Sequence, residues 1–129
     1  MAARLVEKGV RPDVILASPA KRAAKTASVV AKAIEFQKSA IIWDERLYGA
    51  DVSTLAEILW GLDEAYVHAM LFGHNPGFTD LCNWVTRSFV DNIPTCGVAI
   101  IQLNVDRWKD VGSGSGEIMD FDFPKRTAE

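Results

Sequence analysis

The sequence predicts an α/β domain with a largely parallel sheet that is closed by a hairpin. Short apolar runs without alternation are typical of strands covered on both faces. Between them lie segments whose apolar residues are spaced three and four apart, as in amphipathic helices. A glycine-serine segment, Gly112–Gly116, separates the last two strand candidates. Strands that alternate with helices favour parallel pairing, and the final pair favours a hairpin.

The bulk composition indicates one globular domain spanning residues 1–129. Hydrophobic residues make up 49% and charged residues 24%, a balance typical of folded proteins. A net charge of −3 and a pI of 5.4 give no basic excess for a nucleic-acid partner. No apolar run approaches the ~20 residues of a membrane span, and no signal peptide opens the chain. Cys82 and Cys96 form no disulfide framework, which favours a cytoplasmic protein.

The first half of the chain predicts two helices and two strands. Residues 1–9 are interpreted as the end of a helix. Val14–Ala17 is a short buried strand. The next helix is expected to start with Ser18 as its N-cap and Pro19 at its first position. Ala40–Trp43 is the second strand candidate.

The second half predicts two helices and three strands. The helices are Ser53–Leu62 and Pro76 to about residue 87, and the strand between them is Tyr66–Phe72. Val98–Val105 and Ile118–Phe123 are the last two strands. The glycine-serine segment between them precedes a strand rather than a helix, so a hairpin loop is favoured over a phosphate-binding loop.

Two strand-to-helix turns share one design, at Leu16–Arg22 and at Phe72–Phe78. Each leaves a strand, passes a capping residue, Ser18 or Asn75, and enters a helix through a proline. In parallel α/β sheets ligands collect at the carboxyl ends of the strands. The free amides and the positive end of a helix there favour an anion, above all phosphate.

Arg22 and His74 are the candidate functional residues of these turns. Arg22 lies in the first helical turn, from which its guanidinium can fold back and grip phosphate with two hydrogen bonds. His74 ends its strand at the same edge, so both side chains are expected to face one cavity near the amides of residues 18–20. His68 lies roughly 20 Å away at the other end of the strand and is interpreted as structural or solvent-facing. Each turn alone remains open to a purely structural interpretation, because serine-proline is a common helix start.

Longer motifs then point to a known family. Ser18–Thr26 (SPAKRAAKT) resembles the S-P-x-x-R-A-x-x-T segment of the histidine phosphatase superfamily, which includes the phosphoglycerate mutases. Leu71–Gly77 (LFGHNPG) resembles its second histidine motif. Three further segments resemble the small SixA-type phosphohistidine phosphatases: Leu47–Ala50, Pro94–Gly97 and Asp120–Arg126. The resemblance covers essentially the whole chain and implies a phosphoglycerate mutase-like three-layer α/β/α fold with a mostly parallel sheet.

The resemblance also implies roles for single residues. The family builds a phosphate pocket from two histidines and two arginines, and one histidine attacks the phosphoryl group. Arg22 matches the arginine that clamps phosphate oxygens, and His74 matches the second histidine, which steadies the transferring group electrostatically. Ser18 and Asn75 would complete the phosphate-binding set, although Asn75 is chiefly expected to cap its helix. No cofactor or metal is implied, since the cysteines and histidines lack the close spacing of metal ligands.

The family's nucleophile has no counterpart in this sequence. It belongs to an Arg-His-Gly motif at the end of the first strand, and the chain contains no Arg-His pair. Because the chain opens within a helix, we expect it to be N-terminally incomplete and to lack the first strand, and therefore to be catalytically incomplete. By resemblance that strand lies centrally, beside the strand of His74. The empty slot would leave unpaired backbone groups and could support self-association.

These features favour a SixA-type phosphatase whose partner is a phosphohistidine-containing protein, such as a phosphorelay component. The chain as given is expected to bind phosphate or sulfate. One alternative is a non-catalytic phosphate-binding or interaction module. Another is a small-molecule phosphomonoesterase or mutase, but the chain is too short to contain the inserted lid that usually shapes small-substrate pockets. Glu45 could act as a general acid but is better explained as a solvated charge.

Overall fold

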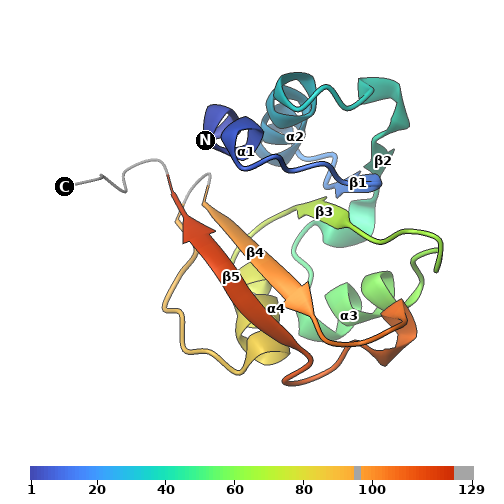
Figure 1. Cartoon of the computed structure of the whole chain (residues 1–129), viewed down its shortest axis with the longest axis vertical. Coiled ribbons are helices and arrows are strands. Elements are labelled where there is room, and N and C mark those ends of the chain that lie inside the picture. The colour runs from blue at the N-terminus through green and yellow to red at the C-terminus, as the bar shows by residue number, and fades with distance from the viewer. Residues whose placement is uncertain (95–96, 124–129) are drawn as a thin grey trace. The chain divides into compact units, whose positions relative to one another are not determined.

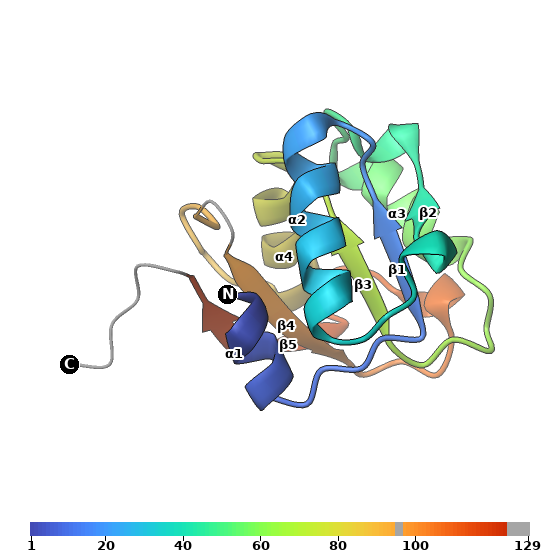
Figure 2. The same cartoon turned by 90° about the horizontal axis from the view of Figure 1, so that it is seen from above.

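The computed structural model describes residues 1–94 and 97–123 of the chain. The chain divides into two compact units, each built from two segments (Figures 1 and 2). The expectation of one domain over residues 1–129 stays a prediction. Unit 1 consists of Met1–Tyr48 and Ala65–His74, and unit 2 consists of Gly49–Glu64 and Asn75–Glu129.

Unit 1 contains a parallel three-stranded sheet in the order β2-β1-β3. β1 (Val14–Ala17) is the central strand, and all four of its side chains are buried. β2 (Ile42–Trp43) and β3 (Ala69–Phe72) pair with it from either side, with Ala17 opposite Phe72 at the carboxyl end. The predicted parallel sheet is confirmed. β3 has no strand on its other edge within the described residues, and self-association at that edge stays a prediction.

Unit 1 also contains two helices, α1 (Ala2–Glu7) and α2 (Lys21–Ala33). Figure 2 shows α2 lying along β1 and β3. The helix was expected to start at Pro19 with Ser18 as its N-cap, and this boundary is wrong. The Oγ of Ser18 does accept a hydrogen bond from the Ala20 amide at 3.2 Å, as an N-cap serine would. The backbone of Ala20, with φ −59° and ψ 142°, is not helical, so Ala20 is the N-cap and the helix starts at Lys21. The buried face of α2 consists of small apolar residues, Ala23, Ala27, Val30 and Ala31.

The amino ends of β1 and β3 are held together by Asp13. Its amide donates to the His68 carbonyl at 2.7 Å. Its carboxylate accepts from the amides of Val67 at 2.7 Å and His68 at 2.9 Å. These backbone hydrogen bonds lower the pKa of Asp13. Because the amides of Val67 and His68 bond a side chain, β3 starts at Ala69 rather than at the predicted Tyr66.

Unit 2 is built from two helices and a hairpin. α3 (Val52–Trp60) packs against α4 (Gly77–Thr86), and α4 packs against the antiparallel strands β4 (Val98–Leu103) and β5 (Gly116–Asp122). The predicted closing hairpin is confirmed, and its strands form a sheet of their own.

Side-chain hydrogen bonds fix both ends of α3. The carboxylate of Asp51 caps its first turn by accepting from the Thr54 amide at 2.9 Å. The indole of Trp60, its last residue, donates to the Val111 carbonyl at 2.7 Å. This bond holds the helix against the connection between β4 and β5, which contains the 3₁₀ turn η3 (Trp108–Asp110).

Some sequence features fall outside the described residues, namely Thr95, Cys96 and the Pro124–Arg126 end of the last resemblance segment. Cys82 lies in α4 and is buried with a free thiol. Within the described parts, none of the helices has the length and apolar character needed to cross a membrane.

Gly77 allows two segments of unit 2 to approach closely. It is buried at the start of α4, and a Cβ at this position would overlap the carbonyl oxygen of Ala50. We therefore expect Gly77→Ala to lower the free energy of unfolding by about 1–3 kcal/mol, as overpacking does. Chemical denaturation measures the change.

The matched control is Gly112→Ala, where the nearest atom to a new Cβ is the Asp110 carbonyl oxygen at 4.0 Å. Both substitutions reduce the entropy of the unfolded chain by a similar amount, so their difference isolates the clash. Equal stability of the two variants would show that the close approach carries no energetic weight.

Candidate phosphate-binding site

β1 and β3 end side by side, and the candidate residues follow them directly. Ala17 pairs with Phe72, and the amide of Ser18 donates to the Phe72 carbonyl at 2.9 Å. Ser18 and His74 therefore leave the sheet at the same carboxyl edge, as the sequence predicted. This is the edge at which parallel α/β sheets bind ligands.

A hydrogen bond joins these two residues. The Nε2 atom of His74 lies 2.9 Å from the Oγ of Ser18. Ser18 is fully buried, and its Oγ also accepts from the Ala20 amide. Because one buried hydroxyl contacts both the imidazole and the approach to α2, the position of His74 is tied to the start of that helix.

This contact leaves one ring nitrogen of His74 for a ligand. A neutral imidazole has one donor and one acceptor nitrogen, whereas the protonated ring has two donors. In the protonated form Nε2–H donates to Ser18, and the Nδ1–H remains to face an anion. A serine oxygen has two lone pairs, so Ser18 can accept from His74 and from Ala20 at once.

Tyr48 is a site residue that the sequence analysis missed. Its ring meets the His74 ring edge-on, with centroids 5.1 Å apart and planes inclined by 73°. Tyr48 follows the 3₁₀ turn η2 (Glu45–Leu47) and is 67% exposed. The only signal in the sequence was its place in the Leu47–Ala50 segment that resembles SixA-type proteins.

Arg22 occupies the first turn of α2 at the same edge. Its side chain is exposed and makes no hydrogen bond or ion pair with the residues that the structure describes. No side chain caps the helix at Ala20, and no acidic residue lies in the first turn. This helix end therefore presents positive charge and amides without intrahelical acceptors.

The amides available to an anion differ from those expected. The prediction was residues 18–20, but the Ser18 amide bonds Phe72, Pro19 has no N–H, and the Ala20 amide bonds Ser18. Because the helix starts two residues later than predicted, the amides of Lys21 and Arg22 take their place.

Asn75, the first residue of the second segment of unit 2, is strongly engaged within that unit. Its Oδ1 accepts from the amide and the hydroxyl of Thr79, at 3.1 and 2.8 Å. Its Nδ2 donates to the Ile93 carbonyl at 2.6 Å and to Asn92 at 3.2 Å. Asn75 thus bonds the first turn of α4, and both of its amide hydrogens have acceptors. Its phosphate-binding role stays a prediction.

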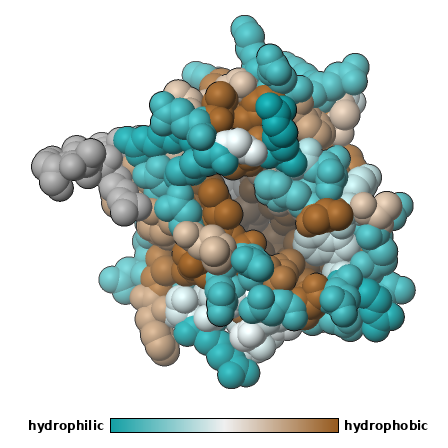
Figure 3. Space-filling view, viewed as in Figure 1, coloured by the Kyte–Doolittle hydropathy of each residue, from teal (hydrophilic) through white to brown (hydrophobic). Residues whose placement is uncertain are grey.

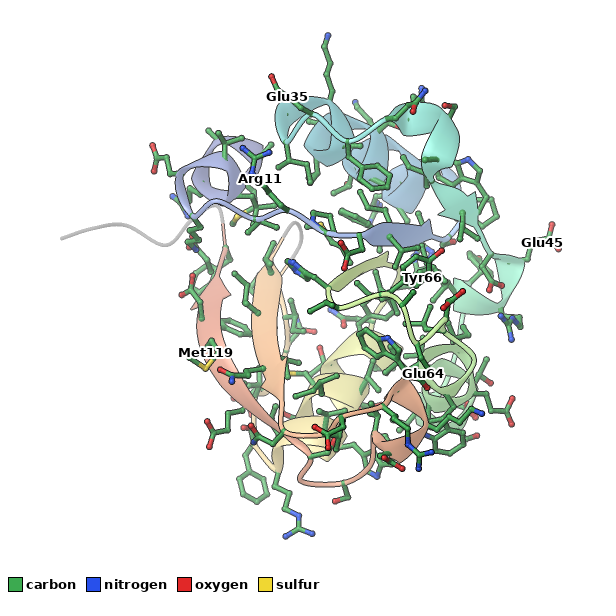
Figure 4. The ribbon with its side chains drawn as sticks, turned by 45° about the vertical axis from the view of Figure 1, so that its right-hand side comes forward. Arg11, Glu35, Glu45, Glu64, Tyr66 and Met119 are labelled. Carbon is green, nitrogen blue, oxygen red and sulfur yellow. The ribbon has the colours of Figure 1, made fainter. Side chains whose placement is uncertain are left out.

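The acidic residues of unit 1 near Tyr48 are Asp44 and Glu45. Hydrogen bonds from the Arg46 guanidinium, the shortest at 2.7 Å, lower the pKa of Asp44. Asp44 is therefore ionised and paired, which does not suit a general acid. Glu45 is exposed, and Figure 4 shows its side chain projecting away from the ribbon. This placement agrees with the solvated charge favoured by the sequence.

The second histidine lies at the opposite end of the sheet. His68 precedes β3, is exposed, and bonds Asp13 through its backbone. The two histidines thus belong to opposite ends of one strand, as predicted. Among the described residues, the structure contains no group of three or more histidine, cysteine and acidic side chains suited to a metal ion.

Comparisons with known proteins agree with this fold. No family model matches the chain, and no curated protein matches it. Solved structures do, among them two proteins assigned to the SixA type. One is a protein assigned as the phosphohistidine phosphatase SixA from Agrobacterium tumefaciens, with a TM-score of 0.69 and 21% identity. The other, assigned likewise, is from Nakamurella multipartitia, with a TM-score of 0.78 and 15% identity.

The likeness extends over nearly the whole chain. It covers 95% of this chain and 75% of the first structure, and 97% of this chain and 78% of the second. At this level of identity the similarity establishes the fold. The predicted phosphoglycerate mutase-like α/β fold is therefore confirmed.

The Ser18 hydroxyl should contribute to stability as well as to the site. Ser18→Ala removes the acceptor of the Ala20 amide and the partner of His74, which leaves partly buried polar groups unpaired. We expect the free energy of unfolding to fall by about 1–3 kcal/mol. Ser28→Ala on α2 is the matched control and should lie within about 0.5 kcal/mol of the parent. Equal losses of unfolding free energy in the two variants would show that the hydrogen bonds of Ser18 do not stabilise the protein.

The Tyr48 ring should restrict the His74 imidazole through their edge-on contact. Tyr48→Ala is expected to increase the mobility of the His74 ring, measured by side-chain NMR relaxation, whereas Tyr48→Phe retains the contact and the rigidity. Such pairs contribute about 0.5–1.5 kcal/mol, and the exposure of Tyr48 favours the lower end. An unchanged His74 ring in Tyr48→Ala would contradict this role.

Proposed function

We propose that this chain supplies the phosphate-binding half of a SixA-type phosphohistidine phosphatase site in the cytoplasm. The observation that carries the proposal is the 2.9 Å contact of Ser18 with His74 beside the uncapped start of α2. It agrees with the motifs around Arg22 and His74 and with the fold of the two SixA structures. The substrate is a protein that carries a phosphorylated histidine.

The residues would act on a phosphoryl group in distinct ways. The Arg22 guanidinium pairs with two phosphoryl oxygens, which a planar fork of N–H groups does well. The amides of Lys21 and Arg22 add fixed dipoles. An Nδ1–H of His74 donates to a third oxygen and stabilises charge as the phosphoryl group moves.

Turnover also needs a nucleophile in line with the bond that breaks. In the family this is a histidine, whose nitrogen bonds to phosphorus as the substrate's nitrogen leaves; water then releases the phosphate. No Arg-His pair exists in the 129 residues. His74 is held by Ser18, and His68 belongs to the opposite end of β3. Cys82 is also unsuitable, because burial raises the pKa of its thiol.

The absence of an Arg-His pair from these 129 residues also favours one alternative, a module that binds phosphorylated partners without hydrolysing them. Both functions use Arg22 and His74 in the same way. They differ in whether a nucleophile from another segment or another chain completes the site.

The test measures binding and turnover separately. We expect the chain to bind inorganic phosphate weakly in calorimetry and to release no phosphate from a histidine-phosphorylated carrier protein. Arg22→Gln should abolish most of the binding, since a charge-assisted contact is worth about 1.5–3 kcal/mol, while Arg107→Gln in unit 2 should not.

Two results would contradict the proposal. Equal phosphate affinity in Arg22→Gln and in the parent would show that phosphate does not bind at Arg22. Phosphate release that His74→Ala abolishes would make His74 the nucleophile and overturn the roles assigned above.

A further inference from the structure

The outer face of α2 carries a line of lysines that starts at the phosphate site. Lys21, Lys25 and Lys32 are all exposed. Their spacing of four and seven residues places them on one side of a helix, with Ser28 between them. From Lys21 to Lys32 the line rises ~16 Å. We call these four residues the lysine stripe.

The amino-terminal part of the stripe, Lys21 and Lys25, is unfavourable for the helix that carries it, whereas Lys32 lies in the last turn, where the dipole favours a cation. α2 contains no acidic residue, and Lys21 and Lys25 are like charges one turn apart, which repel. Lys21 and Lys25 also lie near the positive end of the helix, where the dipole favours negative charge. Within the described residues none of the three lysines forms an ion pair. Helix stability therefore gives no reason for Lys21 and Lys25.

Unit 1 as a whole carries an excess of basic residues, like the stripe. The whole chain has 14 basic against 17 acidic residues. Unit 1, which holds the phosphate site, has nine basic against five acidic. Figure 3 shows hydrophilic side chains projecting from the upper part of this view, where Figure 1 places α2.

The far end of the stripe leads into a surface hollow of about 490 Å³. It is lined by Ser28, Val29, Lys32, Phe36 and Lys38. Val29 is 53% exposed, so the hollow combines apolar surface with two ammonium groups. Such a surface fits an acidic segment that also carries an apolar side chain.

We propose that the lysine stripe and this hollow dock an acidic protein surface next to the phosphorylated residue of the partner. The inference rests on the proposed function, because the stripe starts beside Arg22. The length of the stripe determines how far the contact extends. Acidic side chains of the partner would lie up to ~16 Å from its phosphoryl group. Complementary charge of this kind steers association and fixes the orientation of the partner.

A uniform polyanion fits this surface less well than an acidic protein. Unit 2 carries five basic against twelve acidic residues, so that part of the chain repels long anionic polymers. The docking surface offers a single aromatic side chain, Phe36 in the hollow, whereas proteins that bind single strands stack successive bases on several aromatic rings.

The experiment uses the full chain and a helical peptide with glutamates four residues apart, next to a peptide with glutamines in their place. We expect binding of the glutamate peptide only, measured by fluorescence anisotropy, and a loss of affinity as salt is raised. Lys25→Glu/Lys32→Glu should weaken binding by about tenfold. The matched control, Lys109→Glu in unit 2, should leave it unchanged. Lys25→Gln/Lys32→Gln serves as a second variant if charge reversal perturbs folding.

The outcomes separate this inference from the proposed function. The stripe variants should keep the parent's affinity for inorganic phosphate, since Arg22 and His74 are intact. If Arg22→Gln leaves phosphate binding unchanged while the stripe variants lose the peptide, only the proposed function fails. Equal peptide affinity in the stripe variants and the parent overturns the docking surface. Tighter lysine-dependent binding of single-stranded DNA or of anionic vesicles also overturns it.

Discussion

The buried hydroxyl of Ser18 is the contact on which the candidate site depends. It lies at the end of the central strand and accepts from Ala20, and it meets His74 at 2.9 Å. The amide of the same residue bonds the end of β3. One residue therefore links the end of the β1–β3 pair to Ala20, the N-cap of α2, the helix that carries Arg22. The edge-on contact with Tyr48 then restricts the same imidazole from a second direction.

Electrostatics is the basis on which we propose that this edge binds an anion. In α3 and in α4 a first-turn amide donates a hydrogen bond to a side-chain oxygen, of Asp51 or of Asn75, whereas α2 has no side-chain cap. Its first turn holds cations that oppose the helix dipole. An anionic ligand at the proposed site would resolve that conflict by pairing with the free amides and with Arg22. Cations in the first turn destabilise the unbound helix. Such departures from the rules of local stability are common at functional sites, which supports a binding role for this helix end.

The sequence was informative where local chemistry determines the structure. The apolar run Val14–Ala17 predicted β1 with correct bounds, and the paired turns placed Ser18 and His74 at one edge. It was misleading where a side chain competes for backbone groups. Asp13 takes the amides of Val67 and His68 and shortens β3. The later start of α2 follows from the non-helical backbone of Ala20, which the serine-proline pattern did not indicate. Tyr48 could not be placed, because its contact with His74 joins residues far apart in the chain and arises only from folding.

The central claim is that Ser18, His74 and the start of α2 form one phosphate site. An NMR titration of the chain with inorganic phosphate tests it most directly. We expect the largest shifts at the backbone amides of Lys21 and Arg22 and at the His74 ring, with Ser18→Ala reducing all three together. Shifts confined to other residues, or shifts at α2 that do not respond to Ser18→Ala, would contradict the account.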